Sequence, residues 1–279
     1  MILRRLTEAD AGDARALWQT LFGDTDAFTS WYFSHRFCPQ RSFGMFEGNT
    51  LLAMTLGREV PVAVAGKPCR ALLISGVCTV PAYRKQGMMH RLVAAQLADV
   101  KADGFDFAYL HPVRDDLYKK LGFVDATRSG KLCLEAATPA AGLTVSECDA
   151  PAVLLSVYQA FCRTHNGMAI RDEKAFALCM ADYAQDGGKC LVAQDETGET
   201  VGYACYLPCD AEVPELLGVR KEAFDALLHA VLERVKRPVT ATIPPECVPE
   251  SARAVGMQYA LLHANFSLPL QNGFCLDSY

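Results

Sequence analysis

The chain has 279 residues, 51% of them hydrophobic, and a formal net charge of −5 at pH 7. Such a chain can bury more than one apolar core, so we expect two domains. The acidic balance excludes a strongly basic surface, and no stretch reaches the roughly 18 consecutive apolar residues of a membrane span, so we expect neither nucleic acid nor a membrane as a partner.

The N-terminal stretch MILRRLTEADAGDARALW becomes acidic and helical directly after its two arginines. It lacks the long apolar core and the small-residue cleavage site of a secretory signal, so we expect a cytoplasmic protein. The 12 cysteines are scattered singly and form no C-x-x-C pair, a pattern that favours buried thiols over disulfides or a zinc site. We therefore predict no metal.

Two similar phrases open the two halves of the chain, LTEADAGDARALWQTLF at 6–22 and VSECDAPAVLLSVYQAF at 145–161. Each places a hydroxyl side chain, Thr7 or Ser146, three residues before an aspartate and ahead of an apolar run. This is the pattern of a capped helix start. We predict a helix at both places.

Each half continues with two β-type runs around a turn, which predicts a hairpin at 42–60 and another at 189–207. An apolar stretch ending on proline follows in each half, and a short helix-like segment closes on LGF (121–123) or VGM (255–257). We predict a duplicated α+β (mixed α/β) unit.

The segment AATPAAGLT, at 136–144, has the small-residue and proline-glycine composition of a domain boundary. We therefore place one domain at 1–137 and the other at 143–279.

The junction before Met88 carries two adjacent cations, Arg84 and Lys85, and no acidic residue. The run ALLISGVCTV, at 71–80, predicts a buried strand, and apolar residues at helical spacing predict a helix from Met88 to Gly104. A helix N-terminus exposes unpaired N–H groups that suit a diphosphate, Gly87 permits close approach, and Arg84 and Lys85 add full charges.

This R-x-x-G turn equally describes a solvated cationic loop. The chain contains neither G-x-x-x-x-G-K-[ST] nor G-x-G-x-x-G, which argues against the common nucleotide loops. The corresponding helix of the second half begins with Glu222 and Asp225, and acidic side chains there repel a phosphate. We predict an anion site in the first half alone, and a degenerate second domain.

Two motifs resemble the GCN5-related N-acetyltransferase (GNAT) superfamily. Arg84 to Gly87 match the start of its loop pattern [RQ]-x-x-G-x-[GA], although Met89 stands at the last position, and Tyr118 to Phe123 match Y-x-x-x-G-F. The tandem arrangement resembles the Eis-type acetyltransferases. That family carries a third, sterol-carrier-like domain, which we do not expect in a chain that ends at Tyr279.

The resemblance implies that acetyl-coenzyme A binds between two splayed strands, with Tyr118 beside the sulfur as the acid that protonates the departing thiolate and His111 as a candidate proton relay. An amine attacks the thioester directly in this family. Without the resemblance, Tyr118 is a packing residue and His111 a structural histidine. The residues implied in cofactor binding are Val77, Cys78, Thr79, Arg84, Lys85, Gln86, Gly87, Met88, Met89 and His90.

The acceptor is predicted to be a primary amine of a small molecule or a peptide lysine, with Phe28 and Trp31 lining its pocket as the resemblance implies. Both aromatic residues equally fit an ordinary core. The base stays open among water, a backbone carbonyl and the carboxylates of Asp277 and Tyr279. Two alternatives remain: transfer of a longer acyl group, and a non-catalytic acyl-coenzyme A-binding sensor or scaffold.

Overall fold

The structure is a computed structural model that describes residues 1–137, 139–243 and 253–264. The elements of the first half are β1 (Ile2–Arg5), α1 (Ala11–Phe22), α2 (Asp26–His35), β2 (Phe43–Glu47), β3 (Thr50–Val64), β4 (Lys67–Thr79), α3 (Met88–Ala102), β5 (Phe107–Leu110), α4 (Asp115–Lys119) and β6 (Val124–Leu134). Those of the second half are β7 (Leu143–Glu147), α5 (Pro151–Cys162), α6 (Glu173–Gln185), β8 (Lys189–Asp195), β9 (Thr200–Leu207), β10 (Glu212–Gly218), α7 (Lys221–Val235), β11 (Val239–Ile243) and β12 (Arg253–Ala264).

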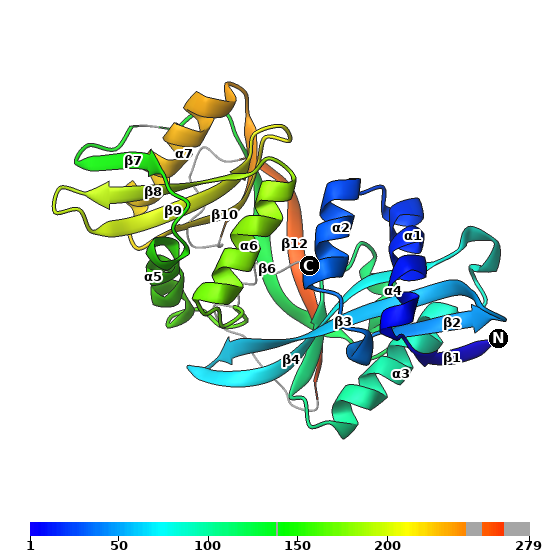
Figure 1. The fold of residues 1–279 in the computed structure, drawn as a ribbon. Coiled ribbons are helices and arrows are strands. Elements are labelled where there is room, and N and C mark those ends of the chain that lie inside the picture. Colours follow the sequence, from blue (N-terminus) through cyan, green and yellow to red (C-terminus); the bar gives the residue numbers. More distant parts are fainter. Residues whose placement is uncertain (138, 244–252, 265–279) are drawn as a thin grey trace.

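The described strands form one sheet, in the order β1-β2-β3-β4-β5-β12-β6-β11-β10-β9-β8-β7 (Figure 1). Each half contributes a strand that pairs with a strand of the other half. β12 pairs with β5 at Leu261↔Leu110, and β6 pairs with β11 at Ile243↔Gly130. β6 and β12 also pair with each other along their lengths, so the two halves share one continuous ladder of backbone hydrogen bonds.

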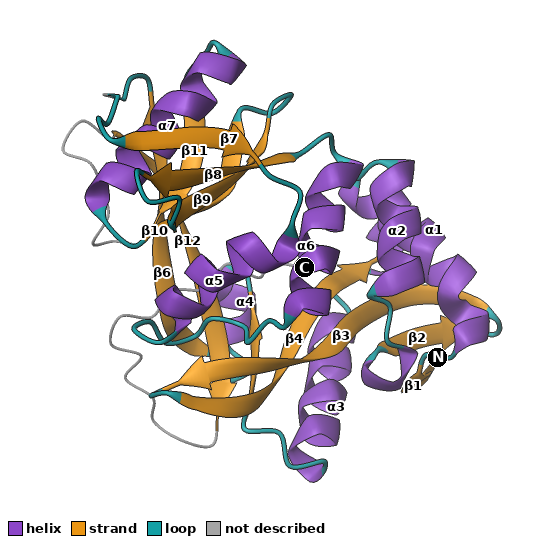
Figure 2. Ribbon diagram, turned by 60° about the vertical axis from the view of Figure 1, so that its left-hand side comes forward, coloured by secondary structure: helices purple, strands orange, loops and turns teal. Residues whose placement is uncertain are grey.

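Helices cover both faces of the sheet, because alternate strand residues point to opposite sides (Figure 2). In the first half, Met54 and Leu56 of β3 pack on α1 and α2, whereas Ala53 packs on Met88 and Leu92 of α3. In the second half, α5 and α6 cover one face and α7 the other. The mixed α/β fold predicted from the sequence is confirmed.

The hairpins and the helix after residue 87 are confirmed, and so is the capped start at Thr7, which forms a capping box with Asp10. The prediction for Ser146 is wrong. Ser146 lies in β7, and α5 begins at Pro151. Proline at the first helical position replaces the expected hydroxyl cap, because its missing N–H would have no partner there.

The VGM segment at 255–257 was expected to end a helix. It lies instead inside β12. The helix-like segment expected before it falls largely in 244–252, outside the described residues. The boundary between 137 and 143 stays a prediction, because the exchange of β6 and β12 joins the halves into one sheet.

The long β3–β4 hairpin reaches the second half. The N–H of Ala63 donates to the carbonyl of Met168 (2.9 Å), and the N–H of Gly167 donates back to the carbonyl of Ala63 (2.9 Å). Arg36 of α2 and Asp182 of α6 form a second connection, 3.3 Å apart. These contacts fix the two halves around a shared cavity.

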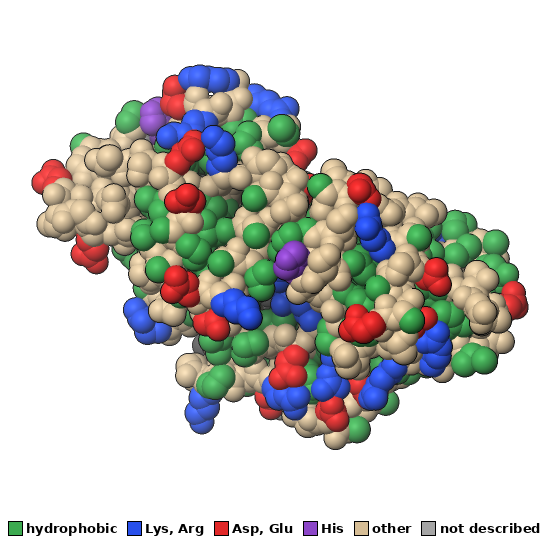
Figure 3. All heavy atoms as spheres, viewed as in Figure 1, with side chains coloured by type: hydrophobic (Ala, Val, Ile, Leu, Met, Phe, Trp, Pro, Cys, Tyr) green, Lys and Arg blue, Asp and Glu red, His purple; other side chains and the backbone are tan. Residues whose placement is uncertain are grey.

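The surface carries charges of both signs, which are interspersed over the face shown in Figure 3. Exposed ion pairs such as Arg70–Glu59 (2.7 Å) and Lys189–Glu147 (3.1 Å) are typical. Each such pair contributes at most about 1 kcal/mol, because water screens it. Within the described ranges, no helix combines the length and the apolar character needed to cross a membrane.

Candidate active site

The strands β4 and β5 part from each other near the middle of β4. Among the described residues they pair from Ala71↔Phe107 to Leu73↔Tyr109, and β4 then continues alongside β3 alone. A β-bulge follows immediately, where two residues, Gly76 and Val77, stand opposite Thr55. A bulge bends its strand and strengthens the twist, which turns the end of β4 away from β5. Within the described ranges, the backbone of residues 77–79 has no strand paired with it on its β5 side, where an extended ligand could pair.

The loop from Arg84 to Gly87 leads into α3 without a capping side chain. Lys85 and Gly87 both have left-handed φ angles, of 64° and 75°. In the part of the chain that the structure describes, the N–H groups of residues 85–90 donate to no backbone carbonyl. These N–H groups and the positive end of the helix dipole form a site that fits a diphosphate.

The cations of this loop are exposed. Arg84 folds back, its Nε donating to the carbonyl of Thr79 (3.2 Å), while the Lys85 side chain is at the surface. His90, in the first turn of α3, has its Nε2 3.4 Å from the carbonyl of Leu117, next to Tyr118. The first turn of α3, which follows the Arg84–Gly87 loop, is therefore in direct contact with α4.

We predict that Gly87→Ala weakens coenzyme A binding about tenfold, or about 1.4 kcal/mol. No heavy atom lies within 4 Å of the position that a Cβ would take, so the methyl group would meet no protein atom, and the expected loss comes from its crowding of a ligand at the N–H groups. Gly104→Ala is a matched control, because Gly104 also has a left-handed φ (71°) and open surroundings. Calorimetric titration with coenzyme A measures both, and equal losses would contradict the assignment.

Tyr118 lies in α4, half-buried, with its ring 5.8 Å from that of Phe123 in an edge-to-face contact. Burial, with a smaller contribution from the neighbouring Cys78 thiol, raises the pKa of Tyr118 to about 12. Burial likewise raises the pKa of Cys78 to about 12. At neutral pH the phenol is thus fully protonated beside the bulged strand, as a proton donor must be.

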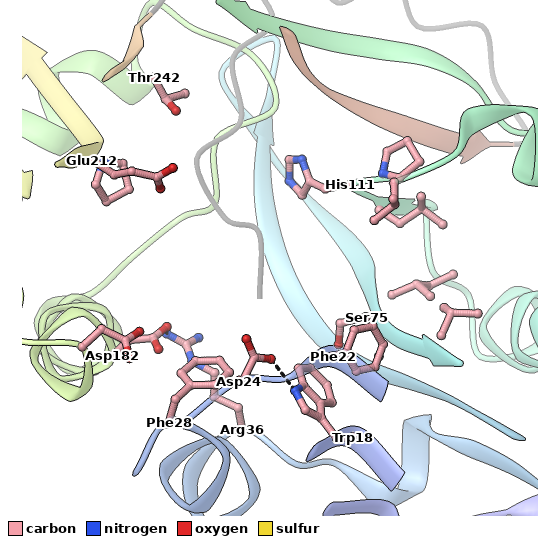
Figure 4. Close-up of a pocket in the computed structure, with 18 of the residues that line it drawn as sticks. Trp18, Phe22, Asp24, Phe28, Arg36, Ser75, His111, Asp182, Glu212 and Thr242 are labelled. Carbon is pink, nitrogen blue, oxygen red and sulfur yellow. Dashed lines mark hydrogen bonds and ion pairs between the residues drawn. The ribbon is translucent and has the colours of Figure 1, made fainter. Parts of the chain in front are cut away.

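A cavity of about 760 Å³ lies between the two halves and includes Tyr118, His111 and Val77 in its wall. Figure 4 shows His111 at this cavity. His111 directly follows β5 and is half-buried. Phe28 also lines this cavity. The second expected acceptor residue, Trp31, is not among the described residues that line it, and is instead buried against His35, with a ring distance of 5.3 Å.

Acidic side chains from both halves line the same cavity, namely Asp24, Asp182, Asp186 and Glu212. Burial raises the pKa of Asp182 to about 6 although the Arg36 guanidinium attracts its charged form, and burial also raises the pKa of Asp186. The sequence analysis missed these residues. They belong to no motif, and those of the second half reach the cavity only because the halves are packed together.

Between β10 and α7, both in the part of the chain that the structure describes, the second half has no counterpart of the Arg84–Gly87 loop. Residues 80–87 separate β4 from α3, whereas only 219 and 220 separate β10 from α7. Glu222 stands in the first turn of α7, and Lys221 is paired with Asp225 (2.9 Å). Across residues 1–137, 139–243 and 253–264, no group of three or more His, Cys, Asp or Glu side chains is arranged to hold a metal ion.

Residues 3–125 match the family model described as an acetyltransferase (GNAT) domain. No curated protein matches the chain. Among solved structures, a GCN5-related N-acetyltransferase from Kribbella flavida has a TM-score of 0.75 at 20% identity, covering 94% of this chain and 70% of that one. Eis1 from Mycobacterium abscessus has a TM-score of 0.71 at 18% identity, covering 95% and 74%.

A tandem GNAT protein from the clavulanic acid biosynthesis pathway has a TM-score of 0.61 at 11% identity, and the match covers 96% of this chain and 99% of that chain. Identities this low establish a shared fold alone. The family model and the folds together confirm the resemblance found in the sequence motifs. Residues 3–125 thus match the acetyltransferase (GNAT) family, within a chain that has the fold of tandem GNAT proteins.

Proposed function

We propose that the protein is an acetyl-coenzyme A-dependent N-acetyltransferase that acts on a primary amine of a small molecule or of a peptide lysine. One observation carries the proposal: the parted end of β4 and the protonated Tyr118 line one large cavity, and the uncapped first turn of α3 contacts α4 at the carbonyl of Leu117, next to Tyr118. A family match to acetyltransferase domains over the same residues supports it.

The cofactor would occupy the gap between β4 and β5. The backbone of Val77, Cys78 and Thr79 would pair with the pantetheine amides as an added strand. The N–H groups from Lys85 to His90 would hold the pyrophosphate, with Arg84 released from Thr79 to add charge. Because the second half lacks such a loop, we expect one cofactor per chain. A coenzyme A titration that ends at two equivalent sites would contradict this expectation.

The transfer would proceed by direct attack. The amine nitrogen forms a bond to the acetyl carbonyl carbon, the carbon–sulfur bond breaks, and Tyr118 donates its proton to the departing thiolate. The proton lost by the amine passes to His111 or to water. In the second half, Asp182 and Glu212 would line the acceptor site, on the side of the cavity opposite His111 (Figure 4).

A thiol-release assay tests the proposal. Acetyl-coenzyme A and, separately, longer acyl-coenzyme A esters are incubated with the protein and a panel of small primary amines and lysine peptides. We expect amine-dependent thiol release with acetyl-coenzyme A. Tight coenzyme A binding without thiol release for any amine would favour a non-catalytic acyl-coenzyme A-binding module instead.

A further inference from the structure

The bulge of β4 is in contact with a tryptophan of α1. Gly76 has a φ of 55°, and a Cβ built on it would lie 2.7 Å from Cζ3 of Trp18 and 3.1 Å from Leu56. Trp18 is 1% exposed, and its indole is packed against the rings of Phe22, Phe28 and Tyr32. Indole and bulge thus fit each other only while residue 76 has no side chain.

A hydrogen bond fixes the indole in this position. Its Nε1 donates to Oδ2 of Asp24 (2.6 Å), and its ring lies 4.7 Å from that of Tyr32. Asp24 comes just after α1, beyond Gly23, which ends the helix in a left-handed conformation. Figure 4 shows the Asp24 carboxylate at the cavity with its bond to Trp18.

A second hydrogen bond connects α2 to the same turn of β4. The hydroxyl of the buried Tyr32 lies 2.9 Å from Oγ of Ser75, the residue before Gly76. On the opposite face of the sheet, Thr55, which faces the bulge, donates to Oε1 of Gln96 in α3 (2.8 Å). Polar contacts therefore hold the residue before the bulge on one face of the sheet, and the β3 residue opposite the bulge on the other face.

We propose that Trp18, Asp24 and Tyr32 are positioning residues for the transfer reaction, which set the parted end of β4 and so place the thioester against Tyr118. The inference rests on the proposed function and extends it to three side chains that do not touch the reacting atoms. In this proposal α1 and α2 form part of the acceptor pocket. The same two helices also hold β4, the strand that binds the cofactor. A displacement of about 1 Å at this strand would lower turnover by up to about 100-fold.

A pair of Asp24 variants separates the hydrogen bond from the charge. Asp24→Asn keeps an oxygen that accepts from Trp18 Nε1, whereas Asp24→Leu does not, and both lack the charge. We expect the turnover of Asp24→Leu with saturating acetyl-coenzyme A and amine to be about tenfold below that of Asp24→Asn. Equal turnover in the two variants would overturn the positioning role of Asp24.

A double-mutant cycle on Tyr32 and Ser75 gives a test that does not depend on the Asp24 variants folding. Tyr32→Phe and Ser75→Ala each remove one side of the same hydrogen bond with little change in shape. We expect each to lower turnover and to weaken coenzyme A binding about threefold to tenfold, and the double variant to lose no more than the larger single effect. The positioning role of Tyr32 would be contradicted if the single variants kept the turnover and affinity of the parent. It would also be contradicted if the effects of the two substitutions multiplied in the double variant.

The binding measurement keeps this inference distinct from the proposed function. If the parent protein binds coenzyme A but releases no thiol with any amine, catalysis fails, while the Tyr32 and Ser75 variants still report on the bulge through their coenzyme A affinity. If the parent is active and the variants match it in turnover and affinity, the positioning role fails and the proposed function stands.

Discussion

Tyr118→Phe is expected to lower turnover about 100-fold or more, the effect typical of losing a general acid. The phenyl ring keeps the edge-to-face contact with Phe123, so the fold of α4 and the affinity for coenzyme A should stay as in the parent. Thiol release at saturating acetyl-coenzyme A and amine measures the first quantity. Calorimetric titration with coenzyme A measures the second.

The control for this substitution is Tyr206→Phe. Tyr206 is also buried, but it lies in β9, packed in the core beneath α7, and it does not line the cavity described here. Removal of the Tyr206 hydroxyl should leave turnover unchanged. Equal rates for the parent and for Tyr118→Phe would remove Tyr118 from the mechanism.

The proposed role of Tyr118 also predicts how turnover of the parent protein depends on pH. An ordinary tyrosine has a pKa of about 10 and would lose its proton, and its function as an acid, as the pH rises past that value. Burial raises the pKa of Tyr118 to about 12, so it stays protonated up to that higher pH. We expect no fall in turnover with a midpoint near pH 10. A fall at that midpoint would indicate a phenol that water reaches freely.

The local features of the first half were predictable because their signals lie close together in the sequence. The helix from Met88 follows from apolar spacing, and the loop before it from an arginine and a glycine three residues apart. The two hairpins follow from turn residues between β-type runs. In each of these cases a few neighbouring residues decide the backbone conformation.

The strand exchange was not predictable in this way. β12 is separated from β5 by more than 140 residues, and the sequence of neither segment indicates which strand it pairs with. The short strands β1 and β7 were also missed, because four or five residues at the start of each half carry too little pattern. Ser146 illustrates the conflict: its local pattern favours a helix cap, but pairing with Val192 of β8 places it in a strand.

The residues of the candidate site also divide into those with a local sequence signal and those without one. The residues of the loop and Tyr118 were found through motifs, whereas Asp24, Asp182 and Glu212 were not, because only the packing of the two halves brings them to one cavity. Gly76 did carry a signal, as an isolated glycine inside a strand pattern. Such a glycine indicates a bulge or a close contact, and here it marks both.

The second large effect is expected at Glu215, whose side chain is 1% exposed and faces Arg171 at 2.7 Å. Glu215→Ala should destabilise the protein by about 3–5 kcal/mol, since it leaves a buried guanidinium without its carboxylate. The carboxylate also accepts from the hydroxyls of Tyr183 (3.0 Å) and Tyr203 (2.8 Å), and both phenols would lose that acceptor. Urea unfolding followed by circular dichroism measures the change.

Glu147→Ala is the matched control, because Glu147 pairs with Lys189 at 3.1 Å where both side chains are about half exposed. Water screens that pair, so its loss should cost at most about 1 kcal/mol. Similar shifts for the two variants would mean that the buried network adds nothing beyond a surface pair. Arg171 and Tyr183 both line the cavity, so a large effect at Glu215 would mean that a buried charge network stabilises the part of the second half that forms the cavity wall.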